Sequence, residues 1–287
     1  MVTPALTTFA EPPPAARPPP AALERARGEA RVAFRFDGGN RLAENFQSGC
    51  AKVRFPTVFD DGPAEVVLLN TAGGLTGGDR LSVAVSAGAG SRVSASTQAA
   101  ERIYRALEDA AEVTTRLTVD AGASLDWLPQ ETILFDRSRL TRRLDIDVHP
   151  GARLLAVEAI VLGRAAMGER VRSVELHDSW RVRRGGRLAF ADGLRIDGDS
   201  VATLAGKATG NGAAALATVL MVAPDAEAWL ERARSVLADA QCEAGVSACN
   251  GMLTARLLAA DGFALRIDLT RLIEALRGTT MPRTWTC

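Results

Sequence analysis

The chain has 287 residues, of which 47% are hydrophobic, and its 34 basic and 34 acidic residues balance to a net charge of zero. This length suits a large all-β domain, and the balanced charge argues against a nucleic-acid binder or an acidic solvating protein. No apolar run approaches the ~20 residues that a membrane helix needs, and the N-terminus lacks the pattern of a signal peptide. We therefore expect a cytoplasmic protein that binds neither membranes nor nucleic acid.

The N-terminal segment is rich in proline: seven of the thirteen prolines lie within the first 22 residues. Proline cannot donate a backbone hydrogen bond, so such a run neither continues a helix nor joins a sheet. We predict a disordered or extended tail over residues 1–28 and one β-rich domain over residues 29–287. A ligand for a proline-recognition domain is the alternative interpretation of the tail.

The following segments alternate apolar and polar side chains, which is typical of half-buried strands. We expect strands at residues 81–85, 113–119, 144–148 and 263–267. Turn signals separate such runs at Asp37-Gly38, Asp61-Gly62, Pro150-Gly151, Gly185-Gly186, Asp192-Gly193 and Asp261-Gly262. Short strands with frequent turns predict a mainly β, large single domain of antiparallel sheets, with its clearest hairpin at residues 180–188.

Two segments toward the C-terminus have helical periodicity instead. Residues 224–240 place apolar side chains on one helical face, and residues 268–277 do the same before a stop at Gly278. We expect two helices there, and a strand-like run over residues 252–268 between them. No repeat of fixed period is present in the sequence.

Catalytic motifs are absent from the sequence. No Gly-x-Ser-x-Gly elbow occurs, and the two histidines are His149, next to a turn, and His177, between acidic neighbours. The four cysteines form no Cys-x-x-Cys pair. We expect Cys242 and Cys249 to be buried free thiols and leave Cys287 as an exposed thiol or a metal ligand. The chain is therefore predicted not to be an enzyme and to hold no tightly bound cofactor.

One glycine-rich loop follows an apolar strand at residues 66–69. Its sequence is Asn70-Thr71-Ala72-Gly73-Gly74-Leu75-Thr76-Gly77-Gly78-Asp79. It lacks the Gly-Lys-Ser/Thr of a phosphate loop, and its paired glycines do not fit a dinucleotide fingerprint. Paired glycines permit sharp turns or the close approach of another backbone, so a structural and a functional role both remain open.

This loop resembles the signature of the urease accessory protein UreD family, also called UreH. Further family-like segments follow in order: 97–99, 103–105, 128–135, Glu158 with 162–164, 168–169 and 282–285. The resemblance covers about residues 29–285. The proline-rich tail lies outside it, and Arg102 stands where lysine is common in the family.

The resemblance implies a mostly β fold with a few helices and a chaperone-like role in urea metabolism. Proteins of this family bind the urease apoprotein and recruit a UreF-type helical accessory protein and, indirectly, a UreG-type GTPase. Together these factors insert nickel into the urease active site. The family is not itself enzymatic.

A transient nickel conduit follows as a hypothesis, because a tight site would trap the ion and oxygen ligands exchange more readily than thiolates. The weak nickel candidates are Asp79, Glu158, Glu169 and His177. The wider set of conduit or partner-contact candidates is Asn70, Thr71, Gly73, Gly74, Gly77, Gly78, Asp79, Gln130, Glu131, Asp136, Glu158, Arg164 and Glu169. For the carboxylates, ordinary salt bridges to Arg164 or Arg137 are the alternative. For the whole chain, the alternatives are a pure scaffold without nickel contact and a metal-dependent hydrolase that uses His149 or His177.

Overall fold

The computed structural model describes residues 24–57, 62–164 and 168–286. The predicted tail up to residue 23, the turn residue Asp61 and the terminal Cys287 lie outside these residues. The first strand, β1 (Arg27–Phe36), begins slightly before the predicted start of the domain.

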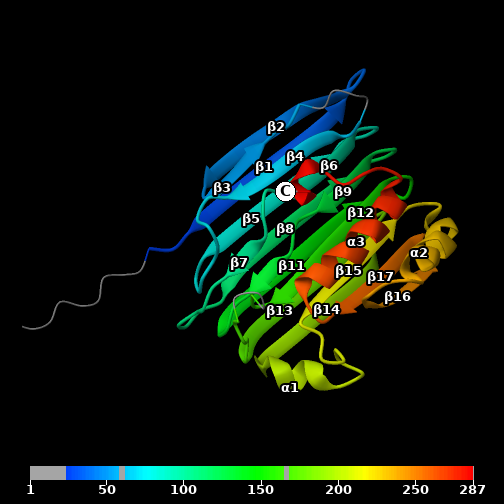
Figure 1. Ribbon diagram of the computed structural model, residues 1–287. Helices are drawn as coiled ribbons and strands as arrows, with labels where there is room; N and C mark the ends of the chain where they lie inside the picture. The colour runs from blue at the N-terminus through cyan, green and yellow to red at the C-terminus, as the bar shows by residue number, and fades with distance from the viewer. Residues whose placement is uncertain (1–23, 58–61, 165–167, 287) are drawn as a thin grey trace, which may run out of the picture.

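Two large β-sheets face each other and form the body of the molecule (Figure 1). The seven-stranded sheet has the order β14-β13-β11-β8-β5-β1-β2. Its strands besides β1 are β2 (Asn40–Gly49), β5 (Arg80–Ala87), β8 (Ala111–Val119), β11 (Ser138–Val148), β13 (Ser173–Arg184) and β14 (Arg187–Asp199).

The ten-stranded sheet has the order β16-β17-β15-β12-β9-β6-β4-β3, with β10 and β7 attached beside β12. Its strands are β3 (Ala51–Arg54), β4 (Ala64–Asn70), β6 (Arg92–Thr97), β7 (Glu101–Ile103), β9 (Ser124–Leu128), β10 (Thr132–Leu134), β12 (Arg153–Leu162), β15 (Ala215–Val222), β16 (Glu243–Cys249) and β17 (Met252–Ala259). The prediction of a mainly β single domain is confirmed.

The prediction of antiparallel sheets is wrong for the centre of both sheets. Strands β1, β5, β8, β11 and β13 pair in parallel, and so do β4, β6, β9 and β12. The cause is the path of the chain, which crosses to the opposite sheet after almost every strand from β4 to β13. Each circuit therefore returns a strand beside its predecessor in the same direction, as in a solenoid.

Antiparallel pairs flank the parallel strands. They are β1-β2 and β13-β14 in the seven-stranded sheet, and β3-β4 and the run β12-β15-β17-β16 in the ten-stranded sheet. The predicted hairpin at residues 180–188 is confirmed, since β13 and β14 pair around the Gly185-Gly186 turn. Asp192-Gly193, predicted as a turn, lies within β14 instead.

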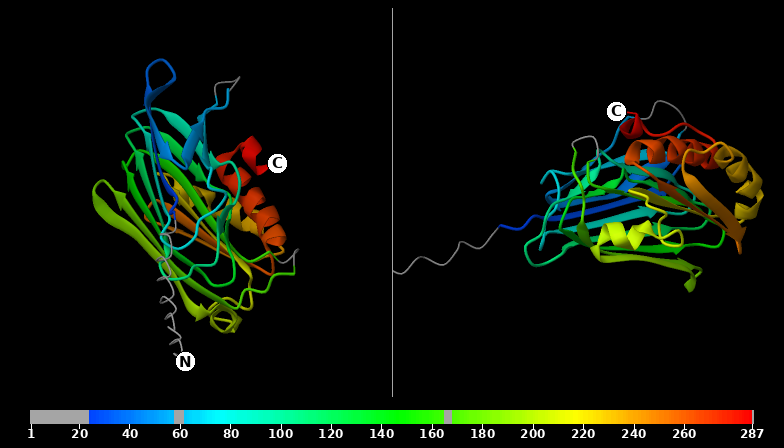
Figure 2. Two further views of the ribbon diagram at one scale, coloured as in Figure 1. Left: turned by 90° about the vertical axis from the view of Figure 1, so that its left-hand side faces the viewer. Right: turned by 60° about the horizontal axis from the view of Figure 1, so that its bottom comes forward.

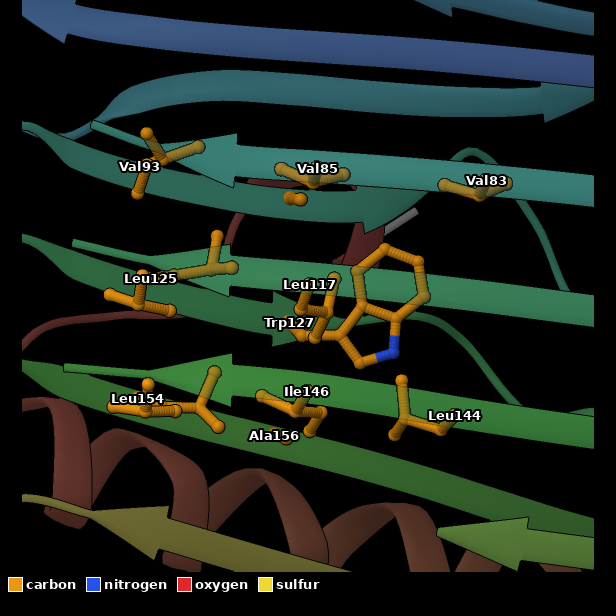
Figure 3. Packing of buried hydrophobic residues seen from close by; sticks show 14 of the residues in the cluster. Val83, Val85, Val93, Leu117, Leu125, Trp127, Leu144, Ile146, Leu154 and Ala156 are labelled. Atoms are coloured by element: carbon orange, nitrogen blue, oxygen red, sulfur yellow. The ribbon is translucent and has the colours of Figure 1, made fainter. Parts of the chain in front are cut away.

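The strand predictions at residues 81–85, 113–119 and 144–148 are confirmed as parts of β5, β8 and β11. Their buried side chains meet those of β6, β9 and β12 between the sheets. Figure 3 shows this core, with Leu117, Ile146 and Trp127 among its members.

Helices cover the outer face of the ten-stranded sheet. Helix α3 (Gly262–Arg277) packs on β12, β15 and β17, and α2 (Leu230–Leu237), preceded by the 3-10 turn η2 (Ala226–Trp229), packs on α3 and β16 (Figures 1 and 2). A short helix α1 (Ser200–Ala205), which the sequence did not suggest, follows β14, and the 3-10 turn η3 (Arg283–Trp285) ends the described chain. None of the helices in the described part of the chain is long and apolar enough to cross a membrane.

The helix predicted at residues 224–240 is shorter than expected, and the strand predicted at residues 263–267 is wrong. Those residues form the first turns of α3, because the Asp261 side chain caps the helix by accepting the backbone N–H of Ala264 at 2.9 Å. The predicted stop is confirmed: Gly278 adopts a left-handed conformation with φ of 71°.

Candidate functional site

The glycine loop, residues 70–79, connects β4 to β5 and packs against the chain at β7. The N–H of Leu75 donates to the carbonyl of Arg102 at 2.7 Å, and the N–H of Tyr104 donates to the carbonyl of Leu75 at 2.7 Å. Gly74 has φ of 142°, and a Cβ there would lie 2.4 Å from the ring of Tyr104. In the first glycine pair, Gly74 thus permits the close approach of the Arg102 backbone and the Tyr104 ring.

The second glycine pair meets the segment before β8. A Cβ on Gly77 would lie 2.3 Å from the carbonyl oxygen of Asp109, and the N–H of Gly78 donates to Ala110 at 3.0 Å. Gly78 also has a left-handed φ of 83°. Both pairs therefore have steric reasons to be glycine that are internal to the fold.

Asp79 closes the glycine loop. Its side chain is buried, and its two carboxylate oxygens accept the backbone N–H groups of Ala26 and Thr76, each at 2.8 Å. These bonds hold the loop to the segment that precedes β1. Near the start of the loop, the Thr71 hydroxyl donates to the carbonyl of Cys50 at 3.1 Å.

Asn70 joins the loop to a half-buried carboxylate that the sequence did not single out. The Asn70 amide donates to both oxygens of Glu101, at 3.1 and 3.2 Å, and its own oxygen accepts the N–H of Ala72 at 3.0 Å. Burial raises the pKa of Glu101 to about 7, although the Asn70 hydrogen bonds act in the opposite direction. Glu101 is thus a carboxyl group that titrates near neutral pH beside the loop.

A first cavity of about 370 Å³ leads from this point into the space between the sheets. Its lining begins at the loop and ends at charged residues deep in the molecule. The lining includes Asn70, Gly74, Glu101, Thr115, Trp127, Arg142 and Glu158.

At the inner end of this cavity lies the Arg142 cluster: Arg142, Glu158, Asp178, Thr132 and Trp180. The guanidinium of Arg142 binds Asp178 through two nitrogens, with Nε 3.1 Å from Oδ1 and Nη2 2.6 Å from Oδ2. The same Nη2 lies 3.1 Å from Oε2 of Glu158. Thr132 accepts from Nη1, and the Trp180 indole donates to Oε2 of Glu158, each at 3.1 Å.

The charged groups of this cluster are buried and perturb one another. Burial raises the pKa of Glu158 to about 7; Arg142 counteracts this shift, whereas the charge of Asp178 adds to it. Burial acts against the charged guanidinium of Arg142, but Asp178 and Glu158 outweigh it and raise the pKa of Arg142. The cluster joins the sheets, because Arg142 and Asp178 lie on β11 and β13 and Glu158 lies on β12.

A second cavity of about 270 Å³ begins on the other side of the same cluster. Arg142 and Glu158 line both cavities, so these two side chains form the wall between them. The second cavity runs to β14, β15 and β17, where Arg256 lies 2.6 Å from Asp192. Together the cavities cross the space between the sheets, with carboxylates at both outer ends and at the shared wall.

Gln130 and Glu131, predicted from sequence, bind the C-terminal segment instead of lying with Glu158. The Gln130 amide donates to the carbonyl of Thr284 at 2.7 Å, although Gln130 also lines the first cavity. Glu131 pairs with Arg266 of α3 at 3.1 Å. These contacts fasten α3 and η3 to the ten-stranded sheet.

Asp136, Arg164 and Glu169 gather at another point on the molecule. Asp136 accepts the backbone N–H groups of Arg172 and Ser173, at 2.8 and 3.1 Å, and these bonds lower its pKa. Glu169 pairs with Arg164 at 3.4 Å. For Glu169, the geometry therefore supports the alternative of an ordinary salt bridge to Arg164.

The two histidines lie on the surface. His177 is 2.8 Å from Asp197 in a neighbouring strand, and Nδ1 of His149 accepts the N–H of Gly151 at 3.1 Å within a turn. Among residues 24–57, 62–164 and 168–286, no group of three or more His, Cys, Asp or Glu side chains is arranged to hold a metal ion. Of the four nickel candidates, only Glu158 lines the passage formed by the two cavities.

The cysteines that the structure describes are free thiols, as predicted for Cys242 and Cys249. Cys242 is buried as expected, and burial raises its pKa to about 12. The expected burial of Cys249 is wrong, because this residue is exposed on β16. Neither residue lies at the wall between the cavities.

Comparison with known proteins agrees with the resemblance of the glycine loop. A family model described as UreD urease accessory protein matches residues 26–286. "Urease accessory protein UreD" of Rhizobium rhizogenes (strain K84) is 50% identical over 264 residues, which cover 91% of this chain and 96% of the relative. The protein of the same name from Xanthobacter autotrophicus (strain Py2) is 47% identical over 278 residues, 96% of this chain and 95% of the relative. The chain belongs to the UreD family of urease accessory proteins.

Proposed function

We propose that this chain is a urease maturation factor that binds the urease apoprotein and, with a helical and a GTPase accessory protein, enables nickel insertion into the urease active site. Nickel passes through the interior of the chain, from the glycine loop through the first cavity to the second. The observation that carries this proposal is the pair of cavities that meet at Glu158.

The chemistry of the passage supports a transient cargo. Glu101 lies near the loop, Glu158 lies at the shared wall, and Asp178 and Asp192 line the second cavity. Carboxylate oxygens bind a divalent ion without the strength of thiolates, so an ion exchanges from one to the next. Of the cysteines that the structure describes, none lines either cavity.

The glycine loop has a different role in this proposal. Because Asp79 uses both oxygens on backbone donors, we assign it to the shape of the loop and not to nickel. The loop then forms the rim of the first cavity. Beside it, the exposed apolar side chains of Tyr104 and Leu107 offer a contact surface for a protein partner.

The cytoplasm is the compartment that we propose for this activity. The described cysteines Cys50, Cys242 and Cys249 are free thiols, which suits a reducing environment.

The test is co-expression of the urease subunits and the other accessory proteins with and without this chain, followed by measurement of urease activity and of nickel in the purified urease. Urease that lacks nickel only when the chain is absent supports a maturation role. Equal nickel loading in both cultures contradicts it.

Substitutions within the passage then test the conduit. Glu101→Gln, Glu158→Gln and Asp192→Asn are expected to lower nickel loading while the accessory complex still co-purifies with urease. Glu112→Gln is the matched control, because Glu112 pairs with Arg80 at an exposed position outside both cavities.

A pure scaffold is the second candidate, favoured by the structural bonding of the glycine loop. Full nickel loading by all three passage variants would support the scaffold and exclude the conduit. Asp79→Ala with normal assembly and normal loading would further show that the loop carboxylate does not contact nickel. A metal-dependent hydrolase remains testable by turnover of the isolated protein, which would have to vanish in His149→Ala or His177→Ala.

A further inference from the structure

We propose that Arg142 is a resident counterion that occupies a divalent-cation site between Glu158 and Asp178, and that nickel crosses the wall between the cavities by taking its place. This inference rests on the proposed function, since it concerns how the ion passes. It assigns to Arg142 the role of a gate and to Asp178 the role of a second ligand.

The geometry of a single nitrogen atom carries the inference. Nη2 of Arg142 lies 2.6 Å from Oδ2 of Asp178 and 3.1 Å from Oε2 of Glu158. Two carboxylate oxygens from opposite sheets thus converge on one point of positive charge. A divalent ion at that point would find the same two oxygens as ligands.

The surroundings allow the guanidinium to leave that point. Cavities of about 370 Å³ and about 270 Å³ lie on its two sides, and Arg142 lines both. Most buried side chains are close-packed and have no such space. Arg142 can therefore move into a cavity without displacing the strands.

The indole of Trp127 is a further polar group beside Glu158 in the first cavity. Nε1 of Trp127 is buried and lies close enough to Glu158 to work against the rise that burial causes in the pKa of that carboxyl, although the two groups make no hydrogen bond of ordinary geometry. Trp127 and Glu158 line the same cavity, and Figure 3 shows the Trp127 indole between the sheets beside Leu117 and Leu144. Water in this cavity would hydrogen-bond to these polar groups and complete the coordination of an arriving ion.

The alternative is a buried salt bridge with a purely structural role. Removal of Arg142 would then leave uncompensated carboxylates and only destabilise the protein. A structural salt bridge and a latent cation site predict different effects of Ni²⁺ on the stability of a protein that lacks the Arg142 guanidinium. In a latent cation site, nickel replaces the missing charge.

The experiment measures Ni²⁺ binding by untagged, full-length protein in equilibrium dialysis, together with its Tm with and without Ni²⁺. Arg142→Gln is expected to bind one Ni²⁺ per chain at least about tenfold more tightly than the wild type. Its Tm is expected to be lower than that of the wild type without metal and to rise on addition of Ni²⁺. The double variant Arg142→Gln/Glu158→Gln is expected to lose both effects.

Arg143→Gln is the matched control. It removes a neighbouring arginine of β11 whose carboxylate partner is Asp145. No gain in Ni²⁺ binding is expected from it. If Arg142→Gln does not fold, Arg142→Met replaces it, because methionine is a long, adaptable side chain that fills the space without a charge. This variant is expected to bind Ni²⁺ more tightly than the wild type.

A folded variant at position 142 that binds Ni²⁺ no better than the wild type overturns the inference, and so does binding that survives Glu158→Gln. These outcomes are separate from failure of the proposed function, because binding is measured on the isolated chain. If the wild type supports nickel loading of urease but the Arg142 variants bind no ion, the gate role of Arg142 is rejected and the proposed maturation role is kept. If the wild type does not support loading, the maturation role is lost whatever the binding result.

Discussion

Gly74 and Gly73 are adjacent in the glycine loop, but they require glycine for different reasons. A Cβ on Gly74 would collide with the Tyr104 ring at 2.4 Å and with the carbonyl of Arg102 at 2.8 Å, whereas a Cβ on Gly73 would meet nothing within 4 Å. We expect Gly74→Ala to lower the free energy of unfolding by about 2–4 kcal/mol and Gly73→Ala by about 1 kcal/mol, since only backbone strain acts at Gly73. Urea unfolding of both variants measures the difference. Equal losses would mean that the close approach to Tyr104 does not require glycine.

Glu101 predicts a pH dependence of stability. Because its pKa is raised from 4.5 to about 7, the folded protein binds this proton more tightly than the unfolded chain does. The group therefore stabilises the protein most below the pKa of the unfolded chain, and this stabilisation is lost as pH rises through about 7. We expect Glu101→Gln to gain up to about 3 kcal/mol relative to the wild type between about pH 4 and about pH 8. Unfolding curves across this range measure it, with Glu112→Gln as an exposed control, and a constant difference would contradict the prediction.

The charged residues of the Arg142 cluster can be recognised in the sequence from the alternation of strand side chains. Arg142, Glu158 and Asp178 each interrupt a row of apolar side chains that share one face of a strand, such as Leu140, Leu144 and Ile146 on β11. Glu158 was singled out through the family-like segments, but Arg142 and Asp178 were not. Parity places each residue between the sheets, yet only the pairing of β11 with β13 brings Arg142 beside Asp178. Sequence therefore predicts that such residues are buried, but not which of them meet.

Strand existence was easier to predict from the sequence than strand partnership. The alternation at residues 81–85, 113–119 and 144–148 fixes which side chains face the core. The alternation does not show whether the neighbouring strand runs in the same or the opposite direction. Parallel neighbours one circuit apart therefore have the same sequence pattern as the strands of an antiparallel hairpin. The circuits also vary in length, which is why no repeat was visible: β5, β8, β11 and β13 begin at residues 80, 111, 138 and 173.

Helix α3 shows a conflict between two periodicities in one segment. Phe263, Leu265 and Ile267 alternate as in a strand, but Leu265, Leu269, Leu272 and Leu276 follow helical spacing, and these four are buried on the ten-stranded sheet. Phe263, by contrast, is 76% exposed. The longer apolar stripe determines the structure because it buries more side chains than the short alternation would.

This packing gives a prediction for the helix. Leu272→Ala is expected to cost about 2–5 kcal/mol of unfolding free energy, because Leu272 is fully buried beneath α3. Phe263→Ala removes a larger but exposed side chain and is expected to change it by no more than about 0.5 kcal/mol. Thermal unfolding of the two variants compares them. A similar cost for both would contradict the docking of α3 on the sheet.

At the scale of the molecule, β12 joins the core between the sheets to the core beneath the helices. Leu154 and Ala156 face the first core, whereas Leu155 and Val157 face the second. The two cores are therefore expected to unfold together. We predict that Leu154→Ala and Leu155→Ala each lower the free energy of unfolding by about 2–5 kcal/mol. Each variant is expected to unfold in a single cooperative transition with a lower midpoint. Calorimetry checks this, and two separate transitions in either variant would show that the cores are independent.

The crossing of the chain between the sheets also bears on how the protein folds during synthesis. Local hairpins join β1 to β2, β13 to β14 and β16 to β17, but the central parallel pairs wait for a full circuit of chain. Non-local pairing of this kind is slow. The outer apolar face of β12 and β15 is covered only when α3, which follows both strands along the chain, is complete at Arg277. A nascent chain therefore exposes an apolar sheet face from the synthesis of β15 until α3 has been made, and such a face favours aggregation of incomplete chains.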